Sequence, residues 1–224
     1  MMQRIEHPWN LPPKQAIDLQ KQLSRKVIRK STIKTNAVRK VAGIDTAYRG
    51  GVACAAAVVL QFEDLETIEY KTAARPVAFP YVPGLLSFRE GPVILAALNE
   101  LKSTPDLLIF DGQGIAHPRR LGIASHIGLL VDIPSIGCAK SKLVGHYEQP
   151  GEKRGSFSYL TYHDETIGAV VRTRRRVKPV YVSIGHRVNL RESIKFVLHC
   201  CKGYRLPETT RRADKLSRKK LLIH

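Results

Sequence analysis

The most informative hydrophobic pattern in this chain is a short run that contains no polar residue. Residues 107–110 read LLIF, which is too continuous for a strand with one face in water. The run suits a strand covered on both faces, as in the middle of an α/β sheet. It ends on Asp111 and enters a glycine turn, at the edge where open α/β sheets bind ligands. An aspartate that merely caps a strand in a turn would give the same pattern.

Three apolar or alternating stretches come before this run and predict strands joined by short connections. Gly50-Gly51 is typical of a tight turn, and such turns favour an antiparallel meander. Before the meander, apolar and basic positions alternate as in a basic amphipathic helix that starts after Pro12-Pro13. The predicted helix covers about 11–34, and the predicted strands are 40–47, 52–62 and 65–74.

Helical and strand patterns alternate along the rest of the chain, after a proline-rich loop at 75–87. The order β-β-β-α-β-α-β predicts an α/β fold with a mixed sheet and helices on both faces. Ribonuclease-H-like nucleases use this order, with three antiparallel strands followed by βα units. Helices are predicted from about 88, over 123–131 and 190–201, and from 207; strands over 107–110, 134–138, 166–172 and 179–184; and a surface excursion over 145–165.

The charge of the chain narrows its class of partner. With 37 Lys+Arg against 19 Asp+Glu the formal net charge is +18, which indicates a polyanion: nucleic acid or an acidic membrane surface. There is no apolar run near the roughly 18 residues of a membrane span and no signal-peptide pattern. We therefore expect a nucleic-acid partner, no membrane and a cytoplasmic location. The 224 residues, 43% of them hydrophobic, are expected to form one domain over 1–224, as a monomer.

Two further patterns have more than one interpretation. The densest basic cluster, RTRRRVK at 172–178, either contacts nucleic acid or forms a solvated face, and the same holds for the predicted helix at 11–34.

The cysteines form no CxxC motif, so we expect buried, reduced thiols and no zinc site. They are Cys54, Cys138, Cys200 and Cys201.

Acidic residues stand at positions where chemistry is expected. Asp45 lies in the first predicted strand, where an unpaired carboxylate is costly to bury. If that strand neighbours the 107–110 strand, Asp45 and Asp111 face each other, and a divalent cation relieves their repulsion. Oxygen ligands favour Mg²⁺ or Mn²⁺. Glu90 is either a third ligand or a favourable charge at a helix N-terminus, and Asp214 could be only an i,i+4 ion pair with Arg218.

Six blocks of sequence carry a family resemblance. Their order and spacing are specific, and through them the chain resembles the endonuclease V family, the deoxyinosine 3′-endonucleases. The blocks are GIDTAYRGG (43–51), RPVAFPYVPGLLSFREGPVI (75–94), DLLIFDGQGIAHPRRLGIASHIGLL (106–130), SIGCAKSKLVG (135–145), SIGHRVNL (183–190) and RLPETTRRAD (205–214).

The resemblance implies a ribonuclease-H-like, Mg²⁺-dependent DNA repair endonuclease that hydrolyses the second phosphodiester 3′ to deoxyinosine, leaving 3′-OH and 5′-phosphate. Mn²⁺ is expected to substitute for Mg²⁺. A flipped hypoxanthine would be read in a small pocket by backbone groups. By the resemblance, the metal ligands are Asp45, Asp111, Glu90 and Asp214; His117 and Lys140 lie near the cleaved phosphate; Tyr81 is the strand-separating wedge; and the base pocket comprises Gly84, Leu85, Gly112, Gly114 and Gly122.

Several alternatives remain open at this level. Position 214 varies between Asp and His in the family, so its role is the least determined of the four acids. A proline-flanked tyrosine such as Tyr81 often packs on its own loop, and a lone histidine such as His117 is often structural. The enzyme could act mainly on inosine in RNA, or the chain could be a binding module with a degenerate site. Four acids at matching positions argue against the binding module.

Overall fold

A mixed eight-stranded sheet runs through the protein, as seen in a computed structural model that describes residues 5–222. The strand order is β3-β2-β1-β4-β5-β8-β7-β6. The strands are β1 (Lys40–Arg49), β2 (Val52–Gln61), β3 (Thr67–Pro76), β4 (Leu107–Phe110), β5 (Ser135–Ala139), β6 (Phe157–Tyr162), β7 (Glu165–Val171) and β8 (Val180–His186). The helices are α1 (Pro13–Ser24), α2 (Leu86–Asn99), α3 (Ile123–Val131), α4 (Leu190–Cys200) and α5 (Glu208–Leu221), with a 3₁₀ turn at Thr35–Ala37.

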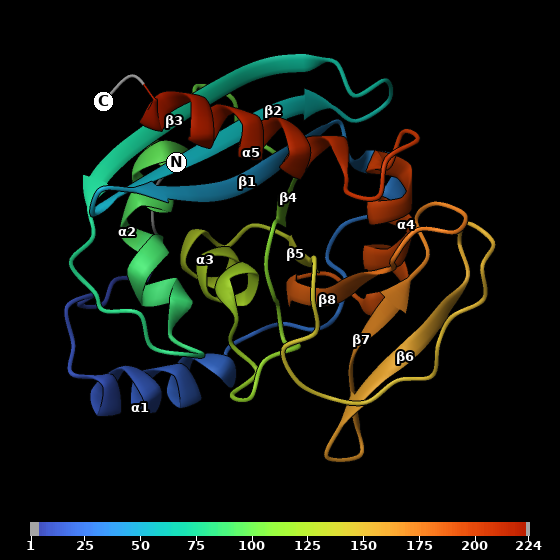
Figure 1. Cartoon of the computed structure of the whole chain (residues 1–224), viewed down its shortest axis with the longest axis horizontal. Coiled ribbons are helices and arrows are strands. Elements are labelled where there is room, and N and C mark those ends of the chain that lie inside the picture. Colours follow the sequence, from blue (N-terminus) through green and yellow to red (C-terminus); the bar gives the residue numbers. More distant parts are fainter. Residues whose placement is uncertain (1–4, 223–224) are drawn as a thin grey trace.

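The predicted mixed α/β sheet is confirmed. β1, β2 and β3 form an antiparallel meander with β3 at the edge, and β1 pairs in parallel with β4, which pairs in parallel with β5. Figure 1 shows α5 lying across β1, β2 and β3, with α2 and α3 on the other side of the sheet. The four cysteines are buried and free, as expected. Between residues 5 and 222 the structure has no helix that is both long and apolar enough to cross a bilayer.

Two predicted segments differ from the structure. The helix expected over 11–34 ends at Ser24, because the next amides bind the carbonyls of Leu23 and Ser24 in a tighter turn. The carbonyl of Ile28 then accepts a hydrogen bond from the Arg187 amide (2.7 Å), which holds the chain out of the helix. The excursion expected over 145–165 contains strand β6. β6 is an edge strand in which only Leu160 is buried, so it lacks the apolar run that reveals the buried strands.

The alternation of side chains along the central strands creates two apolar layers. Val41 of β1 and Leu107 and Ile109 of β4 belong to the layer that includes Ala213 of α5. Ala42, Ile44, Leu108 and Phe110 belong to the layer beneath α2 and α3. Because the side-chain period of a strand is two, positions 45 and 111 continue the first layer and lie on the α5 side of the sheet.

Gly43 allows α5 to lie directly on β1. A Cβ atom built at position 43 would stand 2.1 Å from the backbone carbonyl carbon of Thr209, in the first turn of α5. No side chain fits at that distance, so the absence of a Cβ is what permits this contact. Since Asp45 lies two residues further along the same face of β1, the contact also fixes α5 beside Asp45.

Gly43→Ala is expected to lower the free energy of unfolding by about 1–3 kcal/mol, the typical cost of overpacking a core. The cleavage activity that the family resemblance implies should fall as well, since α5 must move away from β1. Urea denaturation and activity assays measure the two effects. Gly151→Ala is the control, because its Cβ would meet only the Ser156 side chain, with the hydroxyl at 3.2 Å and the Cβ at 3.5 Å. Equal stability of the two variants would show that the close helix contact does not constrain position 43.

A histidine pair joins the N-terminal segment to the helices beneath the sheet. His126 of α3 is buried, with Nε2 2.8 Å from His7 Nε2 and Nδ1 2.8 Å from the Ser87 hydroxyl. The His7 and His126 rings stack at 4.9 Å, next to Trp9 and Phe88. Burial lowers the pKa of His126 well below its ordinary value, and nearby His7 lowers it further. His126 therefore stays neutral in the folded protein at mildly acidic pH.

This burial makes the protein less stable in acid. The unfolded His126 has an ordinary pKa near 6.5 and takes up a proton that the folded state rejects, so stability falls as pH drops below that value. His126→Asn should therefore reduce the loss of unfolding free energy between about pH 6 and pH 5 by about 1 kcal/mol relative to wild type. Asp45 and Glu90, whose pKa values are raised, act in the opposite direction, and their contribution cancels because both proteins contain them. Parallel losses in the two proteins, measured by urea denaturation at each pH, would contradict this expectation.

Candidate active site

Asp45 and Asp111 lie side by side on two parallel strands, Asp45 in the middle of β1 and Asp111 directly after the last residue of β4. The register pairs Ile44 with Phe110, and the Asp111 amide donates to the Ile44 carbonyl at 3.1 Å. Asp45 and Asp111 are therefore the next residues along neighbouring strands, whose backbones lie about 4.8 Å apart. The structure thus has the adjacency of strands on which the expected pairing of the two acids depended.

Helix α5 places two polar side chains next to this pair of aspartates. The Ser217 hydroxyl lies 3.2 Å from Asp45 Oδ2, and Asp214 is one turn before it on the same helix. The predicted ion pair of Asp214 with Arg218 is present (2.9 Å), and Asp214 also lies 4.0 Å from Lys140 Nζ. Asp214 therefore forms a surface ion pair with Arg218 and is also a neighbour of Lys140 and Asp45.

Lys140 stands between the acids as their internal cation. It follows β5, and its ammonium forms an ion pair with Asp111 Oδ2, whose side chain is 9% exposed. Burial and the neighbouring Asp111 and Asp214 raise the pKa of Asp45 to about 7, while Lys140 lowers it. Asp45, Asp111 and Asp214 are thus mutually repelling carboxylates whose charge Lys140 partly neutralises.

Glu90 approaches from the opposite face of the sheet. It lies in the second turn of α2, is buried, and accepts a hydrogen bond from the Tyr48 hydroxyl at 2.9 Å. Burial, helped by the nearby Asp45 and Asp111 and opposed by the Tyr48 hydrogen bond, raises the pKa of Glu90 to about 8. Glu90 is therefore close enough for both aspartates to raise its pKa, but the residue that it contacts directly through a hydrogen bond is Tyr48.

The group formed by Asp45, Asp111 and Asp214 suits a hard divalent cation held by few protein ligands. Within residues 5–222 there is no group of three or more His, Cys, Asp or Glu side chains arranged to bind a metal. Mg²⁺ does not require one, because it is usually bound by one or two carboxylates together with waters and substrate phosphates. Asp45 and Asp111 supply that pair, and their mutual repulsion is what a cation would relieve.

A cavity of about 360 Å³ opens beside these acids. Asp111 and Lys140 line one end, Gly84, Gly112 and Gly122 contribute backbone, and Tyr81 stands at the loop that borders it. The Tyr81 side chain is 72% exposed. Gly84, with φ +78°, takes a left-handed conformation that favours glycine and turns the loop back into α2. The predicted wedge and three of the five predicted base-pocket residues thus border one cavity next to the acids.

The other two predicted base-pocket residues do not line this cavity. Leu85 is buried in a small apolar cluster with Phe79 and Phe88. Gly114 is buried, and its amide donates to the Ser183 hydroxyl at 2.8 Å. A Cβ at Gly114 would stand 2.0 Å from the Ile184 carbonyl oxygen, so glycine is required there by packing against β8.

The Gly84 carbonyl is held by three side chains that converge on it. Gln20 of α1 donates at 3.0 Å, Arg119 at 2.7 Å, and His117 Nε2 lies 3.0 Å away. The other ring nitrogen of His117 accepts from the Arg119 amide, and burial lowers the His117 pKa to about 4. His117 is therefore neutral and occupied at both nitrogens in this structure, and a phosphate contact would require releasing one of them.

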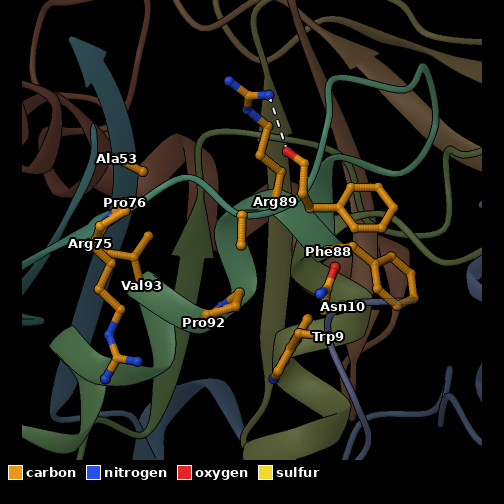
Figure 2. Close-up of a pocket in the computed structure, with 11 residues that line it drawn as sticks. Trp9, Asn10, Ala53, Arg75, Pro76, Phe88, Arg89, Pro92 and Val93 are labelled. Atoms are coloured by element: carbon orange, nitrogen blue, oxygen red, sulfur yellow. Dashed lines mark hydrogen bonds between the residues drawn. The ribbon is translucent and has the colours of Figure 1, made fainter. Parts of the chain in front are cut away.

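A second cavity is lined by residues of the N-terminal segment, the end of β3 and α2. Figure 2 shows this space of about 390 Å³, with Trp9, Phe88, Pro92 and Val93 around it and Arg75 at its rim. Arg89 donates to the Phe79 carbonyl at 3.2 Å, drawn as the dashed line in Figure 2. None of the four predicted acids lines this cavity, so the candidate chemistry belongs to the cavity beside Asp111.

Sequence reasoning missed the residues that position the predicted ones. Ser217, Tyr48, Gln20 and Arg119 contact Asp45, Glu90 and the Gly84 carbonyl. Only Ser217 had a readable signal, since it stands three residues after Asp214 and shares its helix face. The others come from segments distant along the chain, and their spacing carries no pattern.

The strand order and the paired carboxylates on the central strands β1 and β4 are those of a ribonuclease-H-like nuclease. The family model described as Endonuclease V matches residues 21–215. Endonuclease V of Roseiflexus sp. (strain RS-1) is 52% identical over 217 residues, covering 97% of each chain. The chain belongs to the endonuclease V family.

Solved structures agree with this assignment. The crystal structure of Endonuclease V from Streptomyces avermitilis superposes with a TM-score of 0.93 at 44% identity, covering 100% of this chain and 99% of that one. Ciona intestinalis Endonuclease V, in complex with a 24mer DNA containing an inosine followed by a ribo-adenosine, gives 0.83 at 29% identity, covering 94% and 97%. The fold is therefore that of the ribonuclease-H-like endonuclease V proteins.

Proposed function

We propose that this protein is a DNA repair endonuclease that hydrolyses the second phosphodiester 3′ to deoxyinosine, leaving 3′-OH and 5′-phosphate. The observation that carries the proposal is the cavity of about 360 Å³ whose wall includes Asp111 and Lys140. A base held in this cavity keeps its own strand beside the acids, so that the cut is made close to the base that is recognised. The inosine-containing DNA in the complex of the Ciona relative supports this choice of base.

The proposed metal ligands are Asp45 and Asp111, with Glu90 and Asp214 completing the acidic site. A Mg²⁺ or Mn²⁺ ion bound there supplies Lewis-acid chemistry, lowering the pKa of water and stabilising charge on the leaving oxygen. Lys140 neutralises Asp111 in the free protein, and near a phosphate it offers a compact charge for the developing negative charge. Ser217 orients Asp45 through its hydroxyl.

Base choice is proposed to rest on the backbone of the cavity wall. Hypoxanthine presents an O6 acceptor and an N1–H donor, whereas adenine presents the reverse pattern at both positions. The acceptor for N1–H is a carbonyl other than that of Gly84, since three donors already surround the Gly84 oxygen. Those donors instead hold the loop that carries Tyr81, and a weak inosine pair lowers the cost of flipping.

Matched oligonucleotides with one inosine or one adenine test this function. DNA and RNA versions are incubated with the protein in Mg²⁺, in Mn²⁺ and in EDTA. We expect cleavage of inosine DNA in either metal, none in EDTA and none of the adenine strand. Binding of the inosine strand without cleavage in any metal would instead indicate a binding module, and faster cleavage of RNA than of DNA would move the substrate to inosine-containing RNA.

A further inference from the structure

A basic groove begins where the proposed base cavity ends. It encloses about 720 Å³ between the loop after β5, the loop before β8 and the segment before α5. Six cationic side chains line it, against the single acid Glu152. The cations are Lys140, Lys142, Arg172, Arg176, Lys178 and Arg205.

Two of these cations build the groove and are not free to bind a ligand with all their donors. Arg172 donates to the carbonyls of Pro150, Gly151 and Val177. Arg205 donates to the carbonyls of Lys140, Lys178 and Pro179. These hydrogen bonds join the groove walls while both positive charges remain in place, so the groove is held open and electropositive.

Three cations remain available on the groove surface. Lys142 and Lys178 are exposed, and Arg176 is exposed with its Nε 4.0 Å from the exposed Glu152 carboxylate. The basic cluster at 172–178 is therefore divided by the fold, because Arg175 lines a different surface with Gly151 and Lys153. Only part of that cluster belongs to the groove.

The groove and the base cavity are continuous. Lys140, Ser141 and Lys142 line both, and Lys140 contacts Asp111 between them. A strand whose base occupies the cavity thus passes the acids and meets the groove next. We propose that the groove binds the backbone phosphates of the nucleic-acid strand on the 3′ side of the cut. This inference rests on the proposed function, which places the cut 3′ to the recognised base.

The test compares two triple variants that remove equal charge. Lys142→Gln/Arg176→Gln/Lys178→Gln changes the groove. Lys34→Gln/Arg39→Gln/Lys102→Gln changes three exposed cations before β1 and β4, at the opposite end of the sheet from Asp111. Binding of fluorescent single-stranded inosine DNA is measured in EDTA over a range of salt, with the full strand and with strands shortened on the 3′ or the 5′ side.

The groove variant should bind the full strand about tenfold more weakly. The slope of log binding constant against log salt concentration should be smaller in magnitude by about 2, at roughly 0.7 per lost phosphate contact. Lys178→Gln alone should lower the slope by about 0.7. The control triple should match wild type, and shortening the 3′ side should abolish the difference. Equal losses in the two triples, or a difference that disappears on shortening the 5′ side, would overturn the inference. Failure of the proposed function has a separate signature, namely equal binding of inosine and adenine strands by wild type.

Discussion

Asp45→Ala and Asp111→Asn are expected to abolish strand cleavage in Mg²⁺ while inosine DNA still binds in Ca²⁺ or EDTA. The two carboxylates lie on adjacent parallel strands, and each is beside a positive or polar partner that holds it in place. Removing either one takes a ligand from the proposed divalent cation, which supplies the Lewis-acid chemistry, so the rate should fall by about 10²–10³-fold or more. Binding survives because the base cavity is formed mostly by other residues.

Asp18→Asn is the matched control for this prediction. Asp18 is an exposed acid of α1 whose ion pair with Lys21 lies at the surface. The control should cleave at the wild-type rate. Single-turnover rates in Mg²⁺ and anisotropy in EDTA separate chemistry from binding. Appreciable cleavage by Asp45→Ala or Asp111→Asn would remove that residue from the acidic site.

Tyr81→Ala is expected to lower kcat/KM on duplex inosine DNA by about one to two decades, since an aromatic ring stacked on a base contributes about 1–3 kcal/mol. Pro80 and Pro83 restrict the loop, and the hydrogen bonds to the Gly84 carbonyl hold its end. The exposed ring is therefore presented with little loss of entropy. Single strands need no separation, so the loss there should be smaller.

Tyr81→Phe should keep most of the activity, because the ring face and not the hydroxyl is proposed to stack. Tyr70→Ala removes another exposed tyrosine, 56% exposed against 72% for Tyr81, from edge strand β3 and should leave kcat/KM unchanged. Equal losses on single- and double-stranded substrates, or a phenylalanine as poor as alanine, would show that Tyr81 does not act as a wedge.

The central part of the fold was predictable because its strands are buried on both faces. The uninterrupted run at 107–110 and the apolar stretches of β1 and β2 follow directly from that burial. Edge strand β6 was not predictable in the same way. Its side chains are largely in contact with water, so the sequence has no need of a continuous apolar run there. The end of α1 at Ser24 depends on Arg187, which lies more than 150 residues further along the chain.

The candidate site divides along a similar line. Asp45, within the first apolar strand, and Asp111, after the 107–110 run, could be paired from pattern on the condition that their strands are neighbours, and β1 and β4 are neighbours. The position of Asp214 depends on the contact between Gly43 and Thr209, a backbone approach that no periodicity encodes. The same applies to the contact of His117 Nε2 with the Gly84 carbonyl, since the two residues are 33 positions apart and meet only in the folded chain.

The central claim is that one cavity recognises inosine and that the neighbouring acids cut at a fixed distance from it. The most direct measurement moves a single inosine along an otherwise constant DNA strand, one nucleotide at a time, and maps the cut and its end groups in Mg²⁺. The account predicts a cut that moves with the inosine, always at the second phosphodiester on its 3′ side, leaving 3′-OH and 5′-phosphate. A cut that stays at one sequence position, or that varies in distance from the inosine, would contradict it.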